Sequence, residues 1–195
     1  MVCVLALHGF GQTAVGLKGR LNALVRVLKC ELVCCEAPHA LDSSERGRAW
    51  WRASDESPPC YQGINESIDF VLGFIREHGP FDILLGFSQG ACLAAALVLT
   101  HPEIELKGVI LAGGFVPRDP VVCGKLLVPG EIPSLHIIGN KDEIVPPEGS
   151  IALSKLFLDP QIVRHEGGHF IPTASEYAQQ YRSFVAKVLS VEHKL

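Results

Sequence analysis

Short apolar runs alternate with helical patterns from one end of the chain to the other. The runs are continuous rather than alternately apolar and polar, which is typical of parallel strands covered on both faces. Six of them predict strands: Val2–Leu7, Glu31–Cys35, Phe81–Gly86, Gly108–Leu111, Leu135–Ile138 and Gln161–His165.

Between these runs, apolar residues recur with the period of an α-helix. Three series, starting at Leu17, Ile64 and Tyr177, place apolar residues at offsets of 0, 4, 7, 8 and 11, so each forms one stripe on a helix. A fourth predicted helix, Ala91–Thr100, consists of small and apolar residues. The alternation predicts an α/β fold with about six mainly parallel strands flanked by helices. We expect a single domain, residues 1–195, because no linker or repeat interrupts the pattern.

Composition narrows the class of protein. Of 195 residues, 48% are hydrophobic and 19% charged, which excludes a disordered chain. The net charge is −4 with no basic stripe, so we expect no nucleic-acid partner. The seven cysteines form no CxxC pair, which favours reduced thiols in an intracellular protein. No targeting segment is visible and no apolar run approaches the roughly 20 residues of a membrane span. We therefore expect a cytoplasmic protein without a membrane span, with the nucleus as a further possible location.

The third predicted strand ends in a motif that carries chemistry. Residues 86–90 read Gly-Phe-Ser-Gln-Gly, a G-x-S-x-G sequence between a buried strand and an apolar helix. In this setting Ser88 occupies a sharp, strained turn, and Gly86 and Gly90 remove side chains that would clash. The free N–H groups at the start of the helix face any negative charge that develops at Ser88. The alternative to a nucleophile at this position is a tight turn in which Ser88 only caps the following helix.

A serine nucleophile needs a base and a group that orients the base, and in this topology both follow the serine in the chain. Asp142 follows the strand Leu135–Ile138, and His169 follows the strand Gln161–His165. Both therefore lie at the same edge of the sheet as Ser88. Glu143 is a competing acid; we favour Asp142 because it comes earlier in the loop, but the sequence leaves the choice open.

Backbone N–H groups are expected to form an oxyanion hole, the pair of donors that stabilises a tetrahedral intermediate. One is that of Gln89, after the nucleophile, and the other that of Phe10, in the glycine-rich turn after the first strand. The neighbouring His8 ends a buried strand, so we expect it to be structural. Trp50 and Trp51 lie in a long connection, and we expect them to contribute to substrate binding. Adjacent side chains of an extended segment point opposite ways, so the alternative is that one of the two packs inward.

Residues 165–169 read His-Glu-Gly-Gly-His and match the H-E-x-x-H pattern of zinc proteases. That pattern needs a helix, whereas the two glycines disfavour one and Pro172 follows closely. We therefore expect a turn, with no metal and no cofactor. Nothing in the sequence sets an oligomeric state.

Several segments, in this order, carry a resemblance to a known family: Leu7-His8-Gly9-Phe10, Ala37-Pro38-His39, Ala49-Trp50-Trp51, Gly79-Pro80-Phe81-Asp82, Leu85-Gly86-Phe87-Ser88-Gln89-Gly90-Ala91, Gly139-Asn140-Lys141-Asp142 and Gly167-Gly168-His169-Phe170-Ile171-Pro172. With them the chain resembles the FSH family of serine hydrolases, in the α/β-hydrolase superfamily. The resemblance implies hydrolysis of a carboxylic ester, with Ser88 as nucleophile, Asp142 as orienting acid and His169 as base. The superfamily's first two strands are absent from the predicted sheet.

These residues predict a serine esterase acting on a small-molecule ester. The connections are too short for a large lid domain, so we expect an open apolar cleft that accepts medium or longer acyl chains. The same apparatus serves thioesters, and hydrolysis of an acyl thioester, including depalmitoylation, remains the alternative. A non-catalytic binding module is less favoured, because a pure binder has no need of Ser, His and Asp at one edge.

Overall fold

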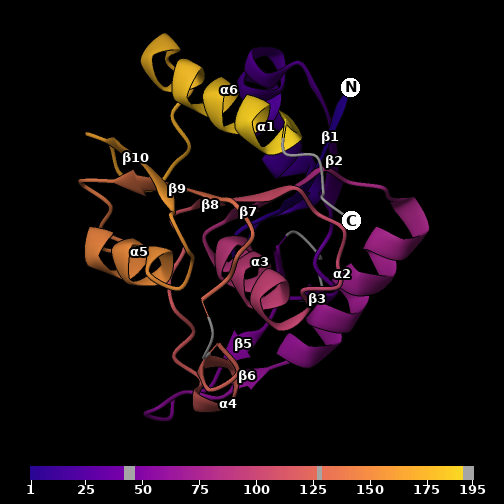
Figure 1. Ribbon diagram of the computed structural model, residues 1–195. Helices are drawn as coiled ribbons and strands as arrows, with labels where there is room; N and C mark the ends of the chain where they lie inside the picture. Colours follow the sequence, from indigo (N-terminus) through magenta and orange to yellow (C-terminus); the bar gives the residue numbers. More distant parts are fainter. Residues whose placement is uncertain (42–46, 127–128, 191–195) are drawn as a thin grey trace.

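A sheet of six parallel strands forms the centre of the molecule, in the order β10-β9-β8-β7-β1-β2 (Figure 1). The structure is a computed structural model that describes residues 1–41, 47–126 and 129–190. The strands are β1 (Val2–Leu7), β2 (Cys30–Cys35), β7 (Ile83–Phe87), β8 (Gly108–Ala112), β9 (Ser134–Gly139) and β10 (Gln161–His165). The predicted parallel sheet is confirmed, with each strand ending within two residues of its predicted bounds.

Helices cover both faces of this sheet. Helices α1 (Ala14–Leu28) and α6 (Ser175–Ser190) lie together on one face, and α2 (Ile64–His78), α3 (Gln89–Thr100) and α5 (Pro147–Ser154) lie on the other (Figure 1). Successive side chains of a strand point to opposite faces, so each strand contributes to both cores. In β1, for example, Val4 and Ala6 pack with α1 and α6, whereas Leu5 and Leu7 pack with α2 and α3.

Helix α3 is buried along almost its whole length, which fits a helix that is apolar on all sides. It packs mainly against β7 and β8, in the middle of the sheet. Its first residue directly follows Ser88, so the helix starts at the edge where the strands end. This placement fixes the nucleophile candidate relative to the two neighbouring strands.

Two long connections contain short elements that the sequence did not predict. Between β2 and α2, β3 (His39–Ala40) pairs with β4 (Arg48–Ala49), and β5 (Arg52–Ala53) pairs with β6 (Tyr61–Gln62). The connection after β8 contains α4 (Pro120–Cys123). Strands of two residues and a one-turn helix are too short to show a hydrophobic period, so the sequence pattern does not predict them.

The described residues include no lid domain over the carboxyl ends of the strands. Within the same residues, none of the helices combines the length and the apolar character that crossing a bilayer requires.

Candidate active site

Ser88 lies on the sharp turn between β7 and α3. Its φ of 55° and ψ of −118° are rare for a residue with a side chain, so the backbone is strained there. Its N–H donates to the carbonyl oxygen of Ala112 in β8, at 2.8 Å. A Cβ on Gly86 would overlap the backbone of α3, and one on Gly90 would overlap the backbone at Leu7. The close backbone approach on both sides of Ser88 therefore requires the two glycines.

Asp142 and His169 lie in contact at the same edge of the sheet. His169 Nδ1 is 2.6 Å from Asp142 Oδ2, and the two side chains are 10% and 3% exposed, respectively. The other carboxylate oxygen, Oδ1, accepts hydrogen bonds from the N–H groups of Ile144 at 3.0 Å and Val145 at 2.8 Å. A carboxylate only accepts, so Nδ1 carries the proton and Nε2 is the basic nitrogen of the neutral ring. Glu143, the competing acid, is exposed to solvent.

The loops that carry this pair are joined to each other. The N–H of Asn140 donates to the carbonyl oxygen of His165 at 2.8 Å, and that of Lys141 donates to Gly167 at 3.0 Å. The Asn140 side chain also donates to Glu166 Oε1 at 2.6 Å. These bonds fix the loop after β9 against the loop after β10, and with it Asp142 against His169.

The imidazole of His169 packs against Phe87, the residue before Ser88, with ring centroids 4.8 Å apart. Its Nε2 is buried and has no hydrogen-bond partner among the described residues, so the Ser88 hydroxyl is not bonded to it. The structure thus joins Asp142 to His169 and places Ser88 on the adjacent turn without closing the last hydrogen bond.

Gly113 lies directly against the His169 ring, a feature that the sequence did not single out. Its φ is +55°, and an added Cβ would lie 2.7 Å from His169 Cε1 and 2.9 Å from Nδ1. Glycine therefore serves both the backbone conformation and the space for the imidazole. The available signal was its place two residues after the predicted strand Gly108–Leu111, at the same edge of the sheet as Ser88.

Two residues that lie near Ser88 have unbonded backbone N–H groups in the described part of the chain. Those of Phe10 and Gln89 form no hydrogen bond within the part of the chain that the structure describes. Gln89 is the first residue of α3, where the N–H groups of a helix lack intrahelical acceptors. Phe10 lies in the turn after β1, where an added Cβ on Gly9 would be 3.2 Å from Ser88 Cβ. Both residues line the same cavity as Ser88.

His8 holds the turn after β1 in place. It is fully buried, its Nδ1 lies 2.8 Å from the Gly9 carbonyl oxygen, and its Nε2 accepts the N–H of Ala37 at 3.1 Å. The accepting Nε2 makes Nδ1 the donor, and burial lowers the pKa of the ring below its usual value. His8 is thus a neutral histidine with both nitrogens occupied, which matches the structural role expected for it.

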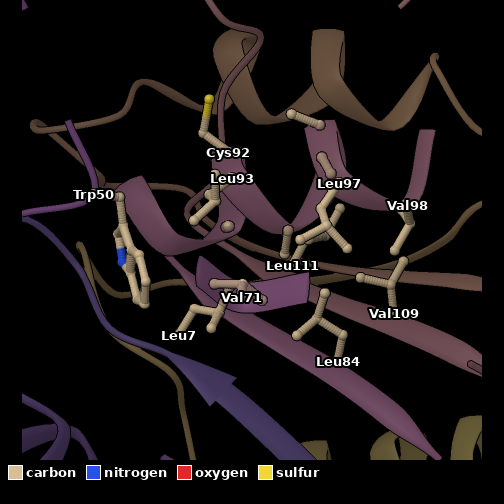
Figure 2. Packing of buried hydrophobic residues seen from close by; sticks show 14 of the residues in the cluster. Leu7, Trp50, Val71, Leu84, Cys92, Leu93, Leu97, Val98, Val109 and Leu111 are labelled. Atoms are coloured by element: carbon tan, nitrogen blue, oxygen red, sulfur yellow. The ribbon is translucent and has the colours of Figure 1, made fainter. Parts of the chain in front are cut away.

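The two tryptophans have separate surroundings. Trp50 is fully buried in the core beside α3 (Figure 2) and donates from Nε1 to the His8 carbonyl oxygen at 2.7 Å. Trp50, which was expected to bind substrate, does not line the cavity beside Ser88; its indole is buried and bonded to a buried carbonyl oxygen instead. Trp51 lines the cavity and stacks on Tyr61, with ring centroids 4.8 Å apart. The Gln89 side chain connects the two residues: its Oε1 accepts the backbone N–H of Trp50 and its Nε2 donates to the Trp51 carbonyl oxygen, each at 2.9 Å.

A cavity of about 660 Å³ opens beside Ser88. Most of its lining is apolar or aromatic, including Phe10, Trp51, Phe115, Val116, Ile144 and Pro146. The two long connections and α5 supply most of this wall. Among the described residues that line it, Arg118 alone is charged.

Residues 1–181 match the model of the family described as serine hydrolase (FSH1). The chain belongs to this serine hydrolase family. A mouse protein named Esterase OVCA2 is 35% identical over 217 residues, covering 93% of this chain and 94% of that protein.

Two solved structures share the fold. Arabidopsis thaliana SOBER1 matches with a TM-score of 0.71 and 20% identity, covering 97% of this chain and 99% of that one. Zea mays acyl-protein thioesterase 2 matches with a TM-score of 0.72 and 18% identity, covering 97% and 94%. The predicted α/β-hydrolase fold, the serine hydrolase family and an enzyme of the carboxylic ester hydrolase class are confirmed.

The H-E-x-x-H segment of this serine hydrolase does not form a helix. His165 ends β10, and residues 166–170 form bends. The Nδ1 of His165 accepts the N–H of Gly167 at 3.2 Å, while the Nδ1 of His169 faces Asp142. The part of the chain with described side chains contains no group of three or more residues arranged to hold a metal ion.

Proposed function

We propose that this enzyme hydrolyses carboxylic esters of medium or longer acyl chains through Ser88, His169 and Asp142, by way of an acyl-enzyme. The observation that supports the proposal is the 2.6 Å contact between His169 Nδ1 and Asp142 Oδ2. It leaves Nε2 as the basic nitrogen, without a partner among the described residues, on a ring that packs against Phe87, the residue before Ser88. A serine hydroxyl is a weak nucleophile unless such a base takes its proton.

In the first step, Ser88 Oγ attacks the ester carbonyl carbon as His169 Nε2 accepts the hydroxyl proton. The carbonyl oxygen becomes an oxyanion, and the N–H groups of Phe10 and Gln89 donate to it. The ring now carries two protons, and Asp142 stabilises its positive charge. When the C–O bond to the alcohol breaks, Nε2 gives its proton to the departing oxygen, and the acyl group remains on Ser88.

In the second step, His169 Nε2 takes a proton from a water molecule that attacks the acyl-enzyme. A second oxyanion forms at the same two N–H groups. The proton then returns from Nε2 to Ser88 Oγ as the bond to the acyl group breaks. The carboxylic acid leaves and the enzyme is restored, so no group outside these residues and water is required.

The cavity supports the assignment of an acyl chain. Its aromatic and aliphatic walls match methylene groups, each of which gains about 0.8 kcal/mol when it is fully removed from water. Its volume of about 660 Å³ exceeds what an acetyl group needs. We therefore expect kcat/KM to rise with acyl length before it levels off.

Reaction with a fluorophosphonate tests the proposal. We expect one label per chain at Ser88, no label in Ser88→Ala, and labelling slowed by orders of magnitude in His169→Ala. An acyl ladder of nitrophenyl esters then gives the chain-length profile. A folded wild-type protein that reacts with neither the probe nor any ester of the ladder would falsify the assignment.

A thioester is the second candidate substrate, because the same two steps act on a thioester carbonyl. The fold shared with Zea mays acyl-protein thioesterase 2 supports keeping it. Comparing kcat/KM for the oxygen ester and the thioester of the same acyl group distinguishes the two candidates. A kcat/KM that is higher for the sulfur ester by more than the difference in their intrinsic reactivity favours the thioesterase.

A further inference from the structure

One positive charge lines an otherwise uncharged cavity. Arg118 lies in the connection between β8 and α4, exposed at the cavity wall. Within the described parts of the chain, its guanidinium forms no ion pair with a carboxylate. Its guanidinium lies near the hydroxyl of Tyr61: burial raises the pKa of that hydroxyl, and Arg118 offsets part of the rise.

The carboxylate next in sequence is already engaged. Asp119 Oδ1 accepts from the N–H groups of Val121 at 2.8 Å and Val122 at 3.3 Å, at the start of α4. Its Oδ2 accepts the N–H of Tyr61 at 2.6 Å. Asp119 is buried by these contacts, so it holds Tyr61 against the connection and does not pair with Arg118.

Tyr61 adds a second donor at the same place. Its ring is 4% exposed and stacks on Trp51, and it lines the cavity. Its hydroxyl oxygen accepts the backbone N–H of Arg118 at 2.9 Å, and no acceptor among the described residues takes its proton. The Tyr61 hydroxyl and the Arg118 guanidinium therefore lie together in the cavity wall. Among the described residues no carboxylate pairs with the guanidinium, and no acceptor takes the hydroxyl proton.

We propose that Arg118 and Tyr61 bind a carboxylate carried by the substrate's acyl chain, so that the preferred substrates are half-esters of dicarboxylic acids. The inference rests on the proposed ester hydrolysis at Ser88. The apolar walls suit the methylene chain, and the planar guanidinium binds a carboxylate through paired hydrogen bonds. A neutral chain gains nothing from this charge, whereas a carboxylate on the chain gains a charge-assisted bond. Arg118 and Tyr61 are thus specificity-determining residues.

Matched substrates test this assignment. Monomethyl esters of dicarboxylic acids from adipic to sebacic acid are compared with methyl esters of monocarboxylic acids of the same chain length. Since Arg118 is exposed, we expect Arg118→Gln to lower kcat/KM about 10-fold for the best half-ester and less than about 3-fold for its neutral match. Raising the salt concentration should weaken the wild-type preference, because the contact is ionic.

Arg52→Gln is the matched control. Arg52 is also exposed, but it donates to the carbonyl oxygens of Ala40 at 2.7 Å and Leu41 at 3.0 Å and does not line the cavity. We expect Arg52→Gln to have the same effect on kcat/KM for the half-ester as for the neutral ester. Tyr61→Phe keeps the stacked ring and removes the hydroxyl, so it should lower the half-ester preference several-fold. The melting temperature of each variant separates these effects from lost folding.

Two results would overturn the proposal while the proposed esterase stands. One is a kcat/KM that falls by the same factor for charged and neutral esters in Arg118→Gln. The other is an Arg118 effect only when the carboxylate is on the alcohol part, since that would move the contact to the leaving group. If wild-type protein cleaves neither kind of ester and Ser88 takes no fluorophosphonate, the proposed esterase itself has failed.

Discussion

The turns at the reacting centre and the wall of the cavity are built in different ways. At the centre, short turns follow β7, β9 and β10. Close backbone approaches at Gly86 and Gly90, and the His169 ring packed against the backbone of Gly113, leave no room for another atom. The cavity wall comes mainly from the two long connections, with side chains such as Trp51, Phe115 and Arg118. The centre is therefore fixed by backbone geometry, whereas the wall is fixed by side chains.

This difference separates what each region can tolerate. A change at the centre moves the reacting groups themselves, and displacements near 1 Å can cost about 100-fold in rate. A change at the wall alters which acyl chains bind and leaves the chemistry in place. The variants below test this division, beginning with the largest expected effect.

Asp142→Asn should have the largest effect of the three. The amide can present its N–H₂ to the ring, which favours the wrong tautomer and removes the charge that stabilises the protonated imidazole. By comparison with serine proteases, we expect kcat to fall about 10⁴-fold on a nitrophenyl ester. Glu143→Gln changes an exposed carboxylate in the same loop and should stay within about 2-fold of wild type. A dead Glu143→Gln beside an active Asp142→Asn would exchange the two assignments.

Gly113→Ala should come next, with a loss of about 100-fold in kcat. The new methyl group would lie 2.7 Å from His169 Cε1, at a backbone φ of +55°, so the imidazole or the strand end must shift. Gly73→Ala is the matched control, because a Cβ at that helical position meets nothing within 4 Å. We expect it to keep full activity and to gain slightly in stability. Normal turnover by Gly113→Ala would show that the site is looser than the geometry implies.

The two tryptophans give the smallest effects on rate and the sharpest contrast. Trp51→Leu opens the wall and should lower kcat/KM about 10-fold for a long acyl ester, with little change for an acetyl ester. Trp50→Phe leaves the His8 carbonyl oxygen unpaired in the core, so the free energy of unfolding should fall by about 2–4 kcal/mol. Acyl ladders and urea denaturation measure the two effects. If Trp50→Phe changed the acyl-length preference without lowering the free energy of unfolding, Trp50 would belong to the cavity wall and not to the core.

Much of the fold could be predicted because its elements carry strong patterns. The strands β1 and β10 have the bounds that their apolar runs predict, and α1, α2 and α6 follow their apolar stripes. Strand β7 starts at Ile83, two residues later than predicted. Just before it, Asp82 bonds to Cys3 of β1 through both its side chain and its backbone: its carboxylate accepts the Cys3 N–H and its own N–H donates to the Cys3 carbonyl oxygen, each at 2.8 Å. Helix α5 escaped prediction because it is short and lacks a clear apolar stripe.

The candidate site divides in the same way. Ser88, Asp142 and His169 follow strand ends, so topology alone brings their turns to one edge, and Phe10 and Gln89 follow from the same rule. The residues of the cavity wall cannot be predicted from strand ends in this way. Tyr61 reaches it through contacts with Asp119 and Trp51, which are distant in sequence from one another. The inward position of Trp50 depends on the His8 carbonyl oxygen, which no local pattern reveals.

A crystal structure of the phosphonylated enzyme shows whether Ser88, His169 and the two backbone N–H groups meet at one reacting group. We expect phosphorus bonded to Ser88 Oγ and one phosphonyl oxygen about 2.7–3.1 Å from the N–H groups of both Phe10 and Gln89. His169 Nε2 should lie within hydrogen-bond reach of Ser88 Oγ or of the phosphonyl group, with Nδ1 still on Asp142. Phosphorus on another residue, or an imidazole turned away from the adduct, would contradict the account.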